Sequence, residues 1–132
     1  IHSVDDRRAL YEGGLGPAPP IGGTRMLHTS VDDMLRKWLR HNGCDGQREV
    51  SARARGVPGS ADAEHAATRF AWRGCRGGAE VALWRLEGPG HVWPGGQRDF
   101  LPWLLGTSSA VIDANAEIWA FFRRFALDRA AS

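Results

Sequence analysis

The sequence predicts an α/β fold, and three segments carry this prediction. Residues 79–86 alternate in polarity and run into the glycine- and proline-rich stretch 88–96, which is typical of a strand followed by a loop. Residues 30–41 and 114–127 place apolar side chains at helical spacing, as helices that pack against a sheet do. At 132 residues, the chain is long enough for one domain at most.

The helix expected at 30–41 has clear signals at both ends. Ser30 and Asp33 have the spacing of a capping box, and Asn42-Gly43 is a stop signal. Because its apolar residues share one face, we expect Trp38 to lie in the core. That face comprises Val31, Met34, Leu35, Trp38 and Leu39.

The remaining segments complete a small sheet and a second helix. We expect strands at 49–54 and 66–72, the second of them in a hairpin with 79–86. Asp113 is placed to cap the last helix, which runs from Ala114 to about Leu127. Turn or irregular structure is expected at 1–23, 75–78 and 97–109.

The charge pattern argues against a nucleic-acid partner. The formal net charge is only +2, and the 17 basic residues, Lys37 the only lysine among them, are scattered among acids. No apolar run approaches the roughly 20 residues of a membrane span, so no membrane partner is expected either. Since the chain begins at Ile1 rather than Met, we expect an upstream part to be missing and Ile1 to end a strand.

The sequence predicts no metal or cofactor site. His2, His28, His41 and His65 lack the short spacings of zinc ligands. The glycines at 13–16 lack the lysine and hydroxyl residue of a phosphate-binding loop. The two cysteines, Cys44 and Cys75, fit either one disulfide or two buried thiols.

His91 is the first candidate functional residue. It lies in the stretch Gly88–Gly96, too rich in glycine and proline for helix or sheet, directly after the expected strand 79–86. A histidine just beyond the carboxyl end of a strand is well placed to act as a general base in an α/β fold. The alternative is that His91 is only a turn residue.

Further landmarks extend along the chain in a fixed order. The opening HSVDDRRALYEGG is similar to a segment of pattern HGxxDxxVPYxGG, and GHVWPGG at 90–96 is similar to a histidine loop. Between and after them come NGC at 42–44 and IDANAEIWAFF at 112–122. Together they resemble the polyhydroxybutyrate depolymerase and feruloyl esterase family of α/β-hydrolases, over nearly the whole chain.

The resemblance implies the C-terminal part of an α/β-hydrolase fold, with sheet strands flanked by helices, as one partial domain over 1–132. Enzymes of that fold carry their nucleophile in a G-x-S-x-G turn, followed by the acid and then the histidine. None of the seven serines here lies in that context. The resemblance therefore implies that the nucleophile lies outside this chain.

The resemblance also assigns catalytic roles. His91 corresponds to the base and Asp6 to the acid, because Asp6 precedes Tyr11 by five positions, as the family's acid precedes its tyrosine. Asp5 is one position out of register. The chain departs from the pattern where Ser3 replaces a glycine, and again where Arg7 and Leu10 stand at positions that prolines often occupy.

Two aromatic residues are candidate substrate contacts by the same resemblance. Trp93 lies two residues from His91 and is either a contact for an acyl or aromatic group or a plug that holds the loop. Tyr11 is expected to line the same cleft. The family's cysteines at the positions of Cys44 and Cys75 pair, which implies a disulfide and a secreted or periplasmic protein.

The function implied is carboxylic ester hydrolysis through a Ser-Asp-His triad, without a cofactor. Polyester, feruloyl and acetyl esters are all open as substrates, and the expected partner is a missing amino-terminal half or a second copy. This chain alone is expected to be inactive. The alternative is a non-catalytic binding or assembly module derived from such a hydrolase. A weaker alternative is a hydrolase in which His91 activates water directly.

Overall fold

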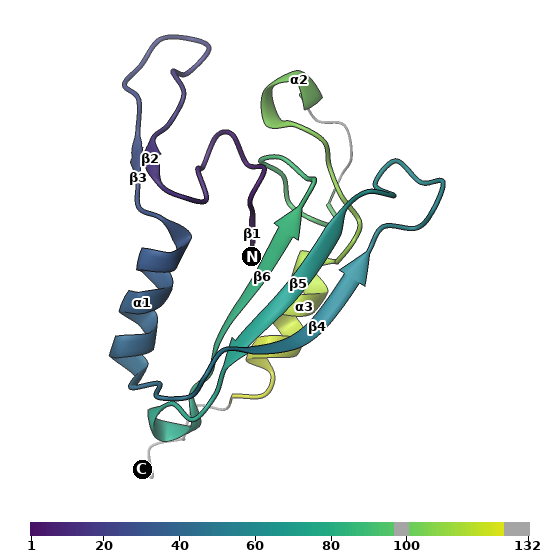
Figure 1. Ribbon diagram of the computed structural model, residues 1–132. Coiled ribbons are helices and arrows are strands. Elements are labelled where there is room, and N and C mark those ends of the chain that lie inside the picture. The colour runs from purple at the N-terminus through teal and green to yellow at the C-terminus, as the bar shows by residue number, and fades with distance from the viewer. Residues whose placement is uncertain (97–100, 126–132) are drawn as a thin grey trace, which may run out of the picture.

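A four-stranded mixed sheet organises the computed structural model, which describes residues 1–96 and 101–125 (Figure 1). Its order is β1 (His2–Ser3), β6 (Val81–Glu87), β5 (Ala66–Trp72) and β4 (Glu49–Arg55). β1 pairs with β6 in parallel, whereas β6, β5 and β4 are successively antiparallel. The predicted α/β class is therefore confirmed at the level of a mixed sheet with helices.

The three long strands lie close to the ranges predicted from the sequence. β6 begins at Val81 rather than residue 79, because Arg76–Gly78 forms a tight 3-10 turn, η1, in which Gly77 has a φ of 62°. Side chains of β6 point alternately to the two faces of the sheet. Leu83 packs on one face and Trp84 and Leu86 on the other.

Helix α1 (Val31–Asn42) covers one face of the sheet with its first turns (Figure 1). The Ser30 hydroxyl accepts the Asp33 N–H, and Gly43 ends the helix with a φ of 59°. Val31 packs with Tyr11 and Leu83 in a buried cluster.

The later turns of α1 extend past this contact. Trp38 is consequently 54% exposed, and the prediction that it lies in the core was wrong. The amphipathic pattern identified the helix correctly, but it could not show how much of the apolar face the small sheet covers.

Helix α3 (Ala114–Phe122) lies on the opposite face of the sheet (Figure 1). The Asp113 carboxylate caps it by accepting the Ala116 N–H, and the Trp84 indole N–H donates to Glu117 at 2.9 Å. The helix ends at Phe122 instead of about residue 127; residues 123–125 are not helical, and 126–127 lie outside the described part.

Short elements occupy segments that were expected to be irregular. β2 (Gly14–Leu15) and β3 (Leu27–His28) form a two-stranded antiparallel ribbon, and β1 and β2 both fall inside the expected loop 1–23. α2 (Pro102–Leu105) is a single turn in the segment 97–109, of which residues 97–100 lie outside the described part. Among the helices described, none is long and apolar enough to cross a membrane.

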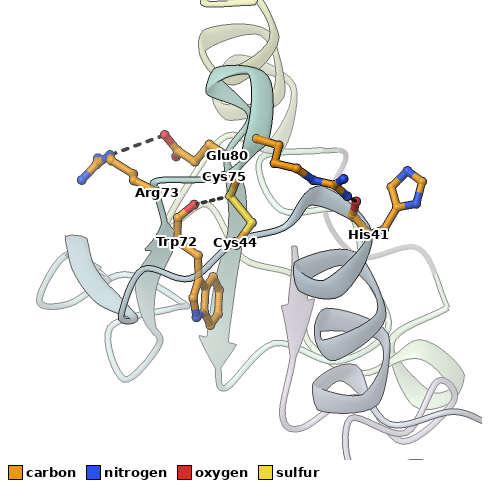
Figure 2. The surroundings of a disulfide bond; sticks show 7 residues. His41, Cys44, Trp72, Arg73, Cys75 and Glu80 are labelled. Atoms are coloured by element: carbon orange, nitrogen blue, oxygen red, sulfur yellow. Dashed lines mark hydrogen bonds and ion pairs between the residues drawn. A yellow bond between two sulfur atoms is a disulfide. The ribbon is translucent and has the colours of Figure 1, made fainter.

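A disulfide joins Cys44 and Cys75 next to the end of α1 (Figure 2). It joins the segment that follows α1 to the turn between β5 and β6, and the Arg76 guanidinium beside it donates to the His41 carbonyl. The pairing that the family resemblance implied is confirmed, and the alternative of two free thiols was wrong.

Next to the disulfide, the buried carboxylate of Glu80 is contacted by three arginines. This carboxylate is 6% exposed and contacts Arg69 at 2.9 Å, Arg124 at 3.0 Å and Arg73 at 3.5 Å. Burial alone would raise the pKa of Glu80, but hydrogen bonds from Arg124 and Arg69 outweigh it and hold that pKa below its ordinary 4.5. These ion pairs join the start of β6 to the segment after α3.

Removing the disulfide should destabilise the protein by about 3–4 kcal/mol, because it closes a loop between residues 31 apart in sequence. We expect this loss in the free energy of unfolding of the Cys44→Ala/Cys75→Ala variant, measured by urea denaturation. Reducing the wild-type protein with dithiothreitol should give the same loss. An unchanged denaturation midpoint after complete reduction would contradict the expectation.

Glu80→Gln should lower the free energy of unfolding by about 2 kcal/mol at pH 7, because it removes charge-assisted hydrogen bonds from a buried carboxylate. Since the folded-state pKa is lowered, this contribution is present above pH 4.5 and is lost as the pH falls through the folded-state value. Wild type and variant should therefore converge in acid in pH-dependent urea titrations. The control is Glu87→Gln, whose carboxylate pairs with Arg85 at the surface and should matter by less than about 1 kcal/mol.

Candidate functional site

The candidate site lies where the two parallel strands, β1 and β6, reach their carboxyl ends. β1 ends at Ser3 and β6 ends at Glu87, and their register pairs Ser3 with Leu86. The chain then continues into two loops on the same side, which we call the acid loop (residues 4–10) and the histidine loop (residues 88–96). Residues far apart in sequence can therefore meet at this edge.

Asp6 and His91 are in direct contact across the two loops, although they are 85 residues apart in sequence. The His91 Nδ1 atom lies 2.8 Å from Asp6 Oδ2. The Asp6 side chain is 8% exposed, whereas that of His91 is 49% exposed. For the imidazole to donate here it must carry its proton on Nδ1, which leaves Nε2 with a free lone pair when the ring is neutral.

The acid loop holds the Asp6 carboxylate in one orientation. Its Oδ1 atom accepts the backbone N–H groups of Arg8 and Ala9, both at 2.8 Å, in a local turn. The His2 ring lies 2.8 Å from the Ala9 carbonyl and closes the loop from the other side. With Oδ1 occupied by the backbone, Oδ2 is the oxygen left to meet His91.

Asp5 has a different role from its neighbour. Its Oδ2 accepts the Gly88 N–H at 2.6 Å, so it contacts the first residue of the histidine loop and not the imidazole. The resemblance selected Asp6 rather than Asp5 as the acid. In the structure, Asp6 contacts the imidazole and Asp5 contacts the backbone of Gly88.

The histidine loop is held on its far side by the segment 105–109. The His91 N–H donates to the Leu105 carbonyl at 2.6 Å, and the Gly90 N–H donates to the Thr107 carbonyl at 3.0 Å. A side chain at Gly90 would meet the Leu105 carbonyl at 2.1 Å, so this close approach requires glycine. Backbone hydrogen bonds therefore hold the loop on this side.

His91 lines a cleft of about 310 Å³ with a largely apolar wall. Asp6 and His2 contribute to its polar side. Its apolar wall includes Leu86, Pro89, Val92, Trp93 and Pro94. A cleft of this kind fits a small apolar group next to the imidazole.

The position of Trp93 is compatible with both roles that the sequence left open. It lines the His91 cleft and is 56% exposed, and its indole N–H donates to the Asn115 side chain of α3 at 3.2 Å. The indole is therefore fixed at one edge and free to contact a ligand with its faces.

Tyr11 does not line the cleft that contains His91. It is buried with Val31 and Leu83 on the α1 side of the sheet, where burial raises the pKa of its hydroxyl and the charge of Asp32 raises it further. Its ring also lies edge-on to His2, with centroids 5.7 Å apart. Tyr11 was expected to contact substrate in the His91 cleft. Instead its side chain packs against Val31 at the start of α1.

The candidate site holds an acid and a base but shows no nucleophile among the residues that the structure describes. The Nε2 atom of His91 has no hydrogen-bond partner there. Two hydroxyls that contact the histidine loop are engaged by its backbone: Ser3 donates to the Pro89 carbonyl and Thr107 to the Gly88 carbonyl. Sequence reasoning missed the structural use of Ser3, although its departure from the family glycine was a visible signal.

No group of three metal-ligating side chains that could hold an ion occurs within residues 1–96 and 101–125. Comparisons of the chain with protein-family models, with curated proteins and with solved structures found no match. The functional interpretation therefore depends on the residues and geometry of this chain.

Proposed function

We propose that this chain supplies the acid and the base of a serine-type carboxylic ester hydrolase of the polyhydroxybutyrate depolymerase and feruloyl esterase type. The supporting observation is the 2.8 Å contact between His91 Nδ1 and a buried, backbone-held Asp6 carboxylate at the edge of an apolar cleft. It agrees with the order of motifs in the sequence. The C-terminal part of an α/β-hydrolase fold is part of the same proposal.

In this proposal His91 acts as general base and then as general acid. Its Nε2 takes the proton of a serine hydroxyl as the serine oxygen attacks the ester carbonyl, and the same proton passes to the departing alcohol. Asp6 holds the imidazole in the required tautomer and stabilises the imidazolium while it exists. Water then attacks the acyl-enzyme with His91 again as base, which releases the carboxylic acid and regenerates the serine.

The serine comes from outside this chain, either from an amino-terminal half or from a partner. β1 is the terminal strand of the described sheet, and its free edge can pair with a further strand. Parallel strands added there would end at the same edge as Asp6 and His91, where a strand-to-helix turn presents a nucleophile in this class of enzyme.

The cleft beside His91 suits an acyl or aromatic group, with Trp93 as its contact, which is compatible with the polyester, feruloyl and acetyl esters that the resemblance leaves open. The disulfide supports a location in an oxidising compartment, secreted or periplasmic.

A second candidate function is a non-catalytic binding or assembly module. The observation that favours it is the apolar surface of α3, where Trp119 is 70% and Phe122 is 62% exposed. A partner chain or a second copy that covered this surface and the free edge of β1 would explain both features.

Ester hydrolysis separates the two functions. We expect the chain alone to show no His91-dependent hydrolysis of p-nitrophenyl acetate or butyrate, because no serine in the described part of the chain hydrogen-bonds to the imidazole. Adding an amino-terminal half with a G-x-S-x-G serine should restore turnover that a serine-directed phosphonate inhibits. In that complex Asp6→Asn should lower kcat by up to about 10⁴-fold, because the imidazole loses the partner that fixes its tautomer.

Asp32→Asn is the matched control, since it removes an exposed carboxylate in the first turn of α1, outside the cleft that contains His91. A complex that forms but has no activity above its His91→Ala form would support the assembly module instead. Phosphonate-sensitive turnover by the chain alone would show that one of its own serines is the nucleophile.

A further inference from the structure

The backbone gives little support to the contact between Asp6 and His91. The ladder between β1 and β6 has only two residue pairs and ends at Ser3 and Leu86. Beyond it, a single main-chain hydrogen bond in the described structure joins the acid loop to β6, from the Val4 N–H to the Leu86 carbonyl at 2.9 Å, and it does not reach the histidine loop. Because the His91 ring is half exposed, water competes for its Nδ1 atom unless the loops are held together.

Two side chains of β1 and the acid loop provide further ties between the loops. The Asp5 carboxylate accepts the Gly88 N–H at 2.6 Å. The Ser3 hydroxyl donates to the Pro89 carbonyl and accepts the Asp5 N–H at 3.2 Å, so it also orients the peptide from which the Asp5 side chain extends. These ties reach Gly88 and Pro89, the residues directly before Gly90 and His91.

The Ser3 hydroxyl donates a hydrogen bond to the Pro89 carbonyl, which would otherwise be buried without a donor. Pro89 is fully buried and Ser3 is 7% exposed, so water does not replace the Ser3 hydroxyl at the Pro89 carbonyl without opening the loop. Glycine, which the family motif has at this position, has no side chain to make this bond. The tie is therefore a property of this chain rather than of the motif.

We propose that Ser3 and Asp5 are positioning residues that hold the acid loop against the histidine loop and thereby set the tautomer of His91. Their catalytic consequence rests on the proposed function, but the tautomer itself can be observed without any substrate. Asp5 acts through the hydrogen bond that its oxygen accepts, not through its charge.

The test is the tautomer of His91 in the whole chain, labelled with ¹⁵N at histidine and recorded by long-range ¹H–¹⁵N correlation at a pH where the ring is neutral. The wild type should show mainly the Nδ1–H form, and the His91→Ala spectrum assigns the signals. In Ser3→Ala and Asp5→Ala, the ratio of the Nδ1–H to the Nε2–H form should fall on the order of threefold to tenfold.

Two matched variants should keep the wild-type ratio. Asp5→Asn removes the charge but retains an oxygen that accepts the Gly88 N–H. Ser51→Ala removes a serine hydroxyl that donates to a backbone carbonyl, that of Arg69, on β4 far along the sheet from the site. Near-UV circular dichroism checks folding, and Ser3→Cys, a weak donor of similar size, replaces Ser3→Ala if the latter does not fold.

Each outcome has one meaning. Folded Ser3→Ala and Asp5→Ala proteins with the wild-type ratio would overturn the proposal and leave the esterase function standing. A fall in Asp5→Asn equal to that in Asp5→Ala would overturn the hydrogen-bond role of Asp5 in favour of its charge. If the wild-type protein showed mainly the Nε2–H form, His91 would not donate to Asp6, and the proposed function would be overturned as well.

Discussion

The parallel pairing of β1 with β6 is the constraint on which the rest of this site depends. It is only two residue pairs long, yet it brings the opening of the chain beside residues more than 80 positions later. Because parallel strands end at the same edge, it places the acid loop and the histidine loop side by side. The antiparallel strands β5 and β4 extend the sheet away from the site and contribute the area on which the helices pack.

Within the site, the local turn of the acid loop matters as much as the hydrogen bond between Asp6 and His91. Asp6 is nearly buried, and a buried carboxylate is tolerable only when its oxygens have hydrogen-bond donors. Two donors are backbone N–H groups of its own loop, and the third is His91. The imidazole therefore completes a site that the backbone has already begun, so a half-exposed ring can still have one defined orientation.

The sequence predicted what depends on local pattern and on the resemblance. Strand-like segments located β4, β5 and β6, of which only the last was identified by alternating polarity, and capping residues located the start of α1. The sequence did not predict which apolar side chains are buried, because burial depends on how much of each helix the sheet covers. Trp38 lies on a correct amphipathic face that extends beyond the sheet, and Tyr11 turned inward because the start of α1 needed apolar packing. Neither position can be predicted from the neighbouring residues in the sequence alone.

The two surfaces that the described fold leaves open bear on both candidate functions. Trp119 and Phe122 are exposed on α3, and β1 has a free edge beside a site that contains an acid and a base. An assembly module requires only that these surfaces be covered. A hydrolase requires in addition that whatever covers the edge of β1 bring a hydroxyl to His91. A buried carboxylate oriented toward an imidazole has a cost that assembly alone does not explain, and this favours the catalytic interpretation.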